Sequence, residues 1–345
     1  MKIMGKKIMK IRFSHISKSE FVLLGIMLCY SVGVGIVNPA FLNIDSFFDI
    51  IRFSSSTLII AMGLFVVMLS GGIDISFMAI ALFGSYTATK ILLSLNISNI
   101  VIAFGISMSI GLILGLFNAW LISWLKLPTF IITLGTQNLF HGIMACFIGA
   151  KTYGAGLLPE SFSKFGSATL FLIHTKNGTV GLTSSVLIVA AVVFATWFLI
   201  YKTIIGREIV ALGNSEDAAR RAGFNPLFLR LIAYGYMGIL AGCAGVVYVC
   251  QVNAVYPDKL VGDELMVIAG AVIGGTSITG GKGKILGVIL GILLIYLFNS
   301  TLIFLGLTSS WNKLAVGSVL TIAASITSLR TLLKNKQQLI FSFER

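Results

Sequence analysis

The sequence predicts an all-α polytopic integral membrane protein, and three observations lead to this fold class. Hydrophobic residues make up 57% of the 345 residues and charged residues only 11%, whereas soluble proteins carry about 25% charged residues. The mean hydropathy is +0.99. The apolar residues are grouped in separate stretches, each near the ~20 residues that a membrane-crossing helix needs. A chain with this composition is neither a soluble domain nor a disordered polypeptide.

We expect about ten transmembrane helices, in chain order at 20–38, 53–70, 73–94, 98–123, 128–149, 181–202, 229–250, 264–280, 284–306 and 311–330. They form a transmembrane domain over residues 20–330, between a basic N-terminal segment (1–19) and a C-terminal tail (331–345). No small-residue cleavage site follows the first apolar stretch, so we interpret it as an uncleaved span. The cysteines form no CxxC pair, and we expect four buried apolar side chains at Cys29, Cys146, Cys243 and Cys250.

The positive charges orient the chain. With the N-terminus inside, 18 lysines and arginines fall on the inner side and 7 on the outer side. Cytoplasmic loops carry such an excess, so both termini are predicted in the cytoplasm and the loop 150–180 outside. The net charge of +13 is thus explained by membrane orientation, with no need for nucleic acid as a partner.

The inner loop 203–228 is predicted to be structured. Asn214 or Ser215 can cap a short helix whose first turn is acidic and whose last turn is basic, and Gly223 follows as a stop. We expect an amphiphilic helix at the inner face rather than a flexible connector. Its residues are Asn214, Ser215, Glu216, Asp217, Ala218, Ala219, Arg220, Arg221, Ala222 and Gly223.

The loop 70–76 places an acid close to an apolar helix. Gly71 and Gly72 break the preceding helix, and Ser70 or Asp74 can cap the next one. An acid near hydrocarbon is costly unless it is paired or caps a helix. Two interpretations stay open for Asp74: a structural cap at the inner interface, and a pathway or coupling residue.

The stretch 128–149 carries uncharged polar residues at helical spacing: Thr133, Thr136, Gln137, Asn138 and His141. Gln137 and His141 are four residues apart and share a face. Such groups suit a polar, neutral solute, and they equally suit hydrogen bonding between helices. Both interpretations stay open.

The glycine-rich segment 274–284 does not fit a phosphate-binding loop, which needs a glycine six residues before its lysine and a serine or threonine after it. Lys282 lacks a glycine at 276, and Lys284 lacks one at 278 and is followed by Ile285. We expect Gly274, Gly275, Gly280 and Gly281 to allow close packing and a broken turn. Asp74 and Glu264 are the acids that approach a span, and there is no charge relay, catalytic grouping or metal-ligand spacing. The pattern predicts a transporter whose energy comes from elsewhere, with no cofactor bound by this chain.

From about residue 53 onward the chain resembles the ribose/galactose-type permease subunits of bacterial ATP-binding-cassette (ABC) sugar importers. Five segments carry the resemblance: 70–76 (SGGIDIS), 128–136 (PTFIITLGT), 206–214 (GREIVALGN), 262–265 (GDEL) and 274–283 (GGTSITGGKG). The chain departs from the family at two places. Phe77 and Met78 replace a Val-Gly pair, and Met266 replaces an aspartate.

The resemblance implies a permease in the bacterial inner membrane that imports a monosaccharide or similar small polar solute by alternating access. It also implies a second permease subunit, identical or related, a cytoplasmic ATPase that uses ATP and contacts residues 214–223, and a periplasmic or lipid-anchored binding protein. The alternative is a stand-alone secondary carrier or facilitator. The sequence does not identify the sugar.

Overall fold

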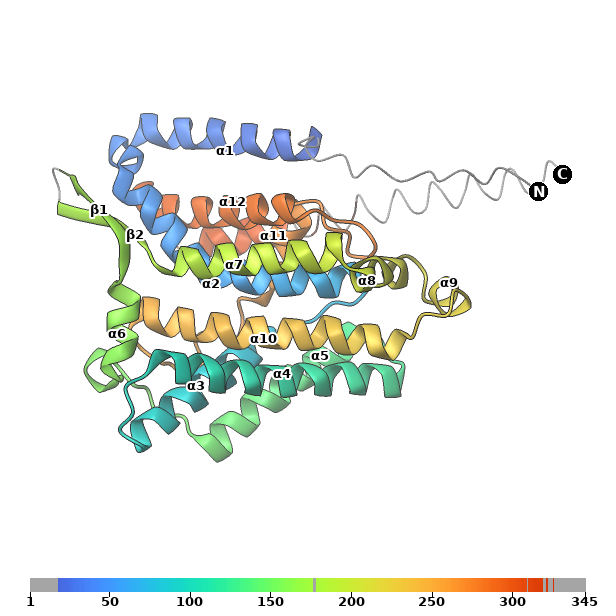
Figure 1. Ribbon diagram of the computed structural model, residues 1–345. Helices are drawn as coiled ribbons and strands as arrows, with labels where there is room; N and C mark the ends of the chain where they lie inside the picture. The colour runs from blue at the N-terminus through green and yellow to red at the C-terminus, as the bar shows by residue number, and fades with distance from the viewer. Residues whose placement is uncertain (1–17, 176–177, 309, 319–320, 322–324, 326–345) are drawn as a thin grey trace.

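The computed structural model describes residues 18–175, 178–308, 310–318, 321 and 325. Its long helices lie roughly parallel in one bundle (Figure 1). A β-hairpin and α6 (Glu160–Ser167) lie at one end of the bundle, which we call the hairpin end. The helices α8 (Ile204–Asn214) and α9 (Glu216–Arg221) lie at the opposite end, which we call the α9 end.

Eight helices in the described part of the chain are long and apolar enough to cross a membrane. The helical elements are α1 (Lys18–Val37), α2 (Ile44–Leu69), α3 (Phe77–Ser94), α4 (Ile100–Leu125), α5 (Thr129–Ile143) continued by η2 (Met144–Ile148), α7 (Ser185–Trp197) continued by η4 (Phe198–Lys202), α10 (Pro226–Val252), α11 (Glu264–Ile273) and α12 (Ile285–Phe304), with the short η1 at Pro39–Leu42. The all-α membrane fold is therefore confirmed.

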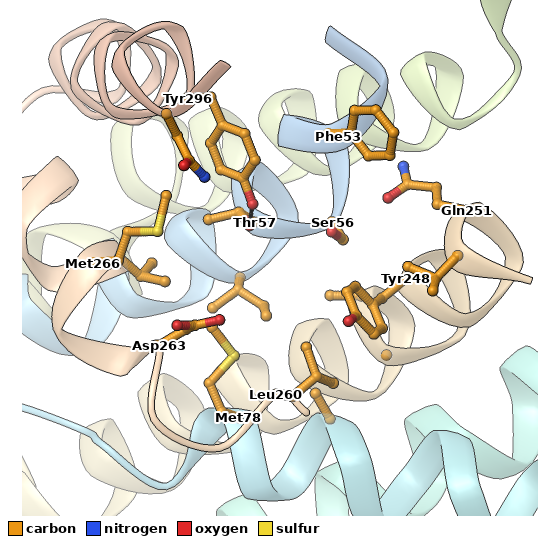
Figure 2. A pocket seen from close by; sticks show the side chains of 17 residues that line it. Phe53, Ser56, Thr57, Met78, Tyr248, Gln251, Leu260, Asp263, Met266 and Tyr296 are labelled. Atoms are coloured by element: carbon orange, nitrogen blue, oxygen red, sulfur yellow. Dashed lines mark hydrogen bonds between the residues drawn. The ribbon is translucent and has the colours of Figure 1, made fainter. Parts of the chain in front are cut away.

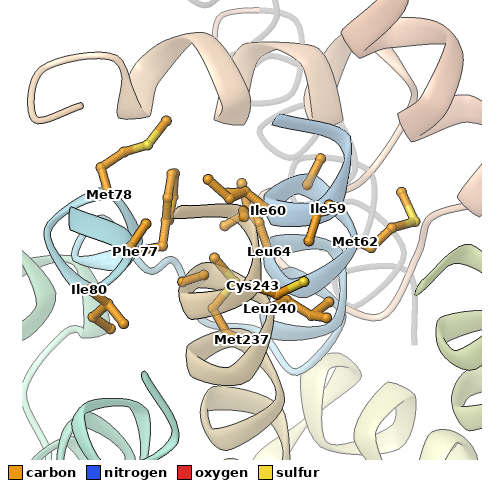
Figure 3. Packing of buried hydrophobic residues seen from close by; sticks show 14 of the residues in the cluster. Ile59, Ile60, Met62, Leu64, Phe77, Met78, Ile80, Met237, Leu240 and Cys243 are labelled. Carbon is orange, nitrogen blue, oxygen red and sulfur yellow. The ribbon is translucent and has the colours of Figure 1, made fainter. Parts of the chain in front are cut away.

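The core lies around α2 and α10. Both helices are apolar and buried along most of their length, as expected for helices hydrophobic on all sides. Figure 3 shows Leu64 of α2 and Phe77 of α3 meeting Met237 and Cys243 of α10. In contrast, α1, α4 and α7 leave large apolar side chains exposed, which fits contact with lipid. Cys243 and Cys250 are buried as predicted, whereas the prediction was wrong for Cys29 and Cys146, which are exposed.

Close contact between helices depends on glycine at particular positions. A Cβ atom on Gly111 of α4 would lie 2.1 Å from the carbonyl oxygen of Gly238 in α10. Likewise, a Cβ on Gly274 would lie 2.2 Å from the carbonyl oxygen of Gly287 in α12. The predicted role of Gly274 in close packing is therefore confirmed.

Three non-helical segments connect helices of the bundle: residues 70–76, 253–263 and 274–284. After α2 the chain turns back as residues 70–76, and α3 begins only at Phe77, four residues later than predicted. The prediction of one helix over 264–280 is wrong, because α11 ends at Ile273 and residues 274–284 form turns. Ten residues at 1.5 Å per residue span about half of a ~30 Å hydrocarbon core. The chain reaches the start of α11 through the non-helical residues 253–263.

The loop 150–180 has more structure than its composition indicated. It contains η3 (Ala155–Leu157), α6 (Glu160–Ser167) and β1 (Thr169–Thr175), which pairs antiparallel with β2 (Gly178–Thr183). In this hairpin Leu172 lies opposite Gly181 and Ile173 opposite Val180.

Most of the predicted span 311–330, the tail 331–345 and all but two residues of the segment 1–19 lie outside the described residues. Residues 310–318 are helical. The predicted number of ten spans and the side of the two termini stay predictions.

Candidate coupling surface and solute cavity

The predicted helix in the loop 203–228 is present as α9 (Glu216–Arg221), directly after α8 (Ile204–Asn214). The hydroxyl of Ser215 caps α9 by accepting a hydrogen bond from the backbone N–H of Ala218 at 3.2 Å. Gly223 ends the turn with a φ of +87°, where an L-side chain would be strained. Three local features explain why a helix of only six residues forms: the glycine after its end, its acidic first turn and its basic last turn.

The two acids of α9 occupy different environments. Glu216 pairs with Arg220 one turn later at 2.7 Å and with Arg230 of α10 at 2.5 Å. Partial burial raises the pKa of Glu216, but hydrogen bonds and charge from both arginines outweigh it and leave the pKa below its ordinary value of 4.5. Asp217 is exposed and makes no ion pair within the described chain. Glu216 therefore ties α9 to α10, while Asp217 faces outward with Ala218 and Arg221.

Beside α9, three segments distant in the sequence meet at glycines. A Cβ on Gly213, at the end of α8, would lie 1.9 Å from the carbonyl oxygen of Leu69 and 2.9 Å from the nitrogen of Gly71. A Cβ on Gly280 would lie 2.6 Å from the Cα of Gly71. The N–H of Gly281 donates to the carbonyl of Leu69 at 3.1 Å. We call this contact of residues 69–71, 213 and 280–281 the glycine junction. It brings three of the predicted motif segments together.

Ser76 holds the N-cap position of α3, so Asp74 is not the capping residue itself. Asp74 is fully buried, and one carboxylate oxygen accepts hydrogen bonds from the N–H and hydroxyl of Ser76 at 2.8 and 2.7 Å. Asn118 of α4 in turn donates to the Ser76 hydroxyl at 2.7 Å. Asp74 thus shapes the turn that leads into α3 rather than capping the helix directly.

Polar residues of α5 form hydrogen bonds with the non-helical residues 70–76 and 253–263 and with the start of α11. Thr133 accepts from the N–H of Ile75 at 3.2 Å, and Gln137 donates to Glu264 at 2.6 Å. His141 contacts the carbonyl oxygen of Pro257 at 2.9 Å. Thr136 and Asn138 bond only to carbonyls of their own helix in the described part of the chain, those of Thr133 and Leu134.

These contacts favour the interhelical interpretation of α5 over a solute-lining one. Glu264 also accepts the N–H of Gly262 at 3.0 Å, so its buried carboxylate is held at the start of α11. Gln137 lies at the middle of the helix Thr129–Ile148, which places the start of α11 about halfway along the bundle.

A cavity lies elsewhere, between the middle of the bundle and the hairpin end (Figure 2). It has a volume of about 240 Å³ and is lined by α2, α3, α10, α11, α12 and the segment before α11. Its polar lining includes Ser56, Gln251 and Asp263. Asp263 belongs to the motif segment 262–265, whereas the sequence analysis had not singled out Ser56 or Gln251. The sequence contains one signal for this cavity, the polar run SSST at residues 54–57 inside an apolar stretch.

Comparison with known proteins relates the chain to membrane permeases. Residues 46–325 match a family model described as branched-chain amino acid transport system / permease component. The ribose import permease protein RbsC of Haemophilus influenzae is 30% identical over 309 residues, which cover 89% of this chain and 92% of the relative. RbsC of Escherichia coli K12 is 29% identical over 306 residues, 88% and 90% of the two chains. The autoinducer 2 import system permease protein LsrC of Yersinia pestis Pestoides F is 30% identical over 316 residues, 90% and 84%. No solved structure matches the chain.

The fold and these matches define a multi-pass membrane permease. The chain belongs to the permease-component family that its residues 46–325 match. Its relatives also confirm the predicted likeness to ribose/galactose-type ABC permeases, and they favour a permease subunit over a stand-alone carrier. Such a chain is a transport subunit rather than an enzyme, and in general it works with an ATPase and a binding protein.

Proposed function

We propose that this chain is the membrane subunit of a bacterial ABC importer for a monosaccharide or similar small polar solute. It acts in the inner membrane as one of two identical or related permease subunits. It binds no nucleotide itself, and a cytoplasmic ATPase uses the ATP. A periplasmic or lipid-anchored binding protein delivers the solute. Relatives named for ribose and autoinducer 2 import, each aligned over more than four-fifths of both chains, support this class of solute.

The observation that carries the proposal is the position of α9 beside the glycine junction. A helix of six residues has little stability in isolation, yet here a cap, a basic last turn and the Glu216–Arg230 pair hold it against α10. The glycine junction then connects α8, which leads into α9, to the non-helical residues 70–76 and 274–284. A partner that pushes on α9 therefore acts directly on the segments that enter the bundle.

The outward surface of α9 supports a docking contact for the ATPase on this helix. Ala219 is buried against the chain and Glu216 is occupied by arginines. Asp217, Ala218 and Arg221 remain exposed and present small and charged groups to a partner. We therefore place the docking contact on these three residues within the segment 214–223. The hairpin end then faces the periplasm and the binding protein, in agreement with the charge bias.

A charge reversal at Asp217 tests the proposal. We expect Asp217→Lys to insert at normal levels, to fail to co-purify with the ATPase and to lose ATP-driven uptake. The matched control is Glu160→Lys, which reverses an exposed acid in the first turn of α6 at the other end of the molecule. Normal co-purification and uptake by Asp217→Lys would remove α9 from the mechanism. Uptake that survives deletion of the ATPase would instead support a stand-alone carrier.

A further inference from the structure

A pocket larger than the cavity of Figure 2 lies at the α9 end, with a volume of about 650 Å³. Glu216 and Arg220 of α9 line it, together with Arg230 near the start of α10. The turn that joins α4 to α5 contributes Lys126, directly after α4, and α5 contributes Thr129 from its first turn. We call it the basic pocket.

The basic pocket carries more positive than negative charge. Its lining contains the cations of Lys126, Arg220 and Arg230 and one carboxylate, that of Glu216. Both arginines bind this carboxylate, which neutralises the charge of one of them, so the lining keeps an excess of two positive charges. The other charged residues of α9 are one acid and one base, and they leave this excess unchanged.

The cations of the basic pocket keep donor groups free. Arg220 binds Glu216 through Nε and Nη2, and Arg230 binds it through Nη2. Among the described residues, no hydrogen bond uses the Nη1 groups of these arginines or the ammonium of Lys126. Ser123 also lines the pocket, and its hydroxyl has no partner in the described chain. A phosphate group has several strong acceptor oxygens and can therefore accept from more than one of these donors.

The wall of the pocket formed by the α4–α5 turn is apolar and exposed. Leu127 and Phe130 line the pocket, and their side chains are 49% and 45% exposed. Trp120 and Trp124 are exposed on the last turns of α4 and stack on each other, with ring centroids 5.4 Å apart. Tryptophan is enriched at the membrane–water interface, so this end of α4 lies at the level of the lipid headgroups.

The apolar wall favours a phospholipid over other sources of an anion. A free phosphate ion would leave this exposed wall uncovered, whereas the acyl chains of a phospholipid would cover it. An acidic segment of the ATPase would approach from water, where the exposed Asp217, Ala218 and Arg221 lie on α9. Basic pockets between membrane helices at the cytoplasmic side suit the headgroups of anionic lipids.

We propose that the basic pocket binds the headgroup of an anionic phospholipid. The phosphate accepts hydrogen bonds from Lys126, Arg220 and Arg230, and the acyl chains lie along Leu127 and Phe130. The bound lipid neutralises the excess charge and connects α9 to the turn between α4 and α5. Its place in the cytoplasmic leaflet and its effect on coupling to the ATPase rest on the proposed function.

Fluorescence quenching of the purified full chain in lipid nanodiscs tests this site. Trp120 and Trp124 are the reporters, in a background in which Trp197 and Trp311 are replaced by phenylalanine. The nanodiscs contain phosphatidylcholine and a small fraction of a lipid with brominated acyl chains, which quench nearby tryptophans. The brominated lipid is either phosphatidylglycerol, which is anionic, or phosphatidylcholine, which has no net charge.

We expect brominated phosphatidylglycerol to quench the two tryptophans at a lower fraction than brominated phosphatidylcholine. Lys126→Gln should reduce this preference about fivefold, as for the loss of one basic residue near an anionic lipid surface. Lys126→Arg keeps the charge and should retain the preference. The matched control Lys282→Gln removes an exposed lysine outside the basic pocket and should leave the preference unchanged.

Equal quenching by the two brominated lipids, or an unchanged preference in Lys126→Gln, would overturn the assignment. Displacement of brominated phosphatidylglycerol by inorganic phosphate at constant ionic strength would assign the pocket to a free anion instead. If Lys126→Gln kept the lipid preference but lost co-purification with the ATPase, the pocket would belong to an acidic segment of that partner.

These outcomes are separate from a failure of the proposed function. A lipid preference in a chain that binds no ATPase would contradict the ABC coupling alone. ATP-driven uptake by a chain without any lipid preference would contradict the lipid site alone.

Discussion

Replacing Glu216 by glutamine tests whether this carboxylate holds α9 against the membrane domain. Its two oxygens accept from Arg220 and from Arg230, whose side chain is only 19% exposed. Glutamine keeps the size and one acceptor oxygen but removes the charge. We expect α9 to open locally more often, while the helix bundle stays folded because its core lies around α2 and α10.

The magnitude follows from the two pairs. The pair with Arg220 is an exposed i,i+4 contact, worth about 0.3–0.5 kcal/mol. The pair with Arg230 is partly shielded and is a charged hydrogen bond, which contributes about 1 kcal/mol after allowance for the exposure of Glu216. The sum of roughly 1–2 kcal/mol corresponds to a factor of about 5–30 in the opening equilibrium.

Amide hydrogen exchange measures this opening at the N–H groups of Ala219 and Phe224, which donate to the carbonyls of Ser215 and Ala219. Protection there should fall about 5–30-fold in Glu216→Gln. The matched control Asp217→Asn removes an exposed charge from the same turn. It should lower protection only about twofold, the effect of about 0.5 kcal/mol from the helix dipole.

The pH dependence has a definite sign. The pKa of Glu216 is lower in the folded protein than its ordinary value of 4.5. Its contribution is therefore fully present above about pH 4.5 and is lost as the pH falls through the lowered pKa. Protection of α9 should fall with acid in the unmodified chain and much less in Glu216→Gln. Equal exchange in Glu216→Gln and Asp217→Asn, or the same acid response in these two variants, would refute the conclusion that Glu216 holds α9 against α10.

Three further predictions follow from the contacts of the bundle. Gly213→Ala should lower the melting temperature and reduce uptake, because its Cβ would lie 1.9 Å from a carbonyl oxygen of α2, whereas Gly156→Ala, which has open space, should change neither. Gln137→Leu should cost about 1–3 kcal/mol of stability by removing a partner of a buried carboxylate, and the exposed Asn138→Leu should cost much less in the same thermal scan. Ser163→Cys should react with an impermeant thiol reagent on intact cells, and protection from it would contradict an outer hairpin end.

Composition and hydrophobic length were enough to predict the membrane class and most spans, because a bilayer requires long, internally hydrogen-bonded helices. The short helix α9 was also predictable, since its cap, its charges and Gly223 are all local signals. The interruption of the span at 264–280 was predictable in part: its glycines indicated a broken turn, but the stretch is apolar enough that it was still interpreted as one span. α11 ends in a local glycine cap: Gly275 has a φ of +87°, its N–H donates to the carbonyl of Val272, and the N–H of Thr276 donates to the carbonyl of Ala271.

The cavity between α2, α3, α10, α11 and α12 could not be predicted from the sequence. The hydrogen-bonding residues of α5 were the candidates for a solute pathway because they are polar residues in an apolar stretch. In the structure Thr133 binds the backbone of Ile75 and Gln137 binds Glu264, so both stabilise other segments of the chain. Residues such as Ser56 and Asp263 become a site only when the helices that carry them converge. Periodicity reveals which side chains share a helix face, and it contains no information on which face meets which cavity.

The α9 end and the cavity are linked through the helices that begin inside the bundle. The glycine junction holds Gly71, and seven residues later Met78 enters the cavity wall. The junction also holds Gly280 and Gly281, which follow the helix α11 that carries Met266. A displacement of α8 and α9 against the junction would therefore reach both methionines through short connections. Close-packed interiors respond to such displacements by switching between discrete arrangements rather than by bending. The contacts that make Gly213 intolerant of a side chain are thus the route by which a displacement of α9 would alter the shape of the cavity between the middle of the bundle and the hairpin end.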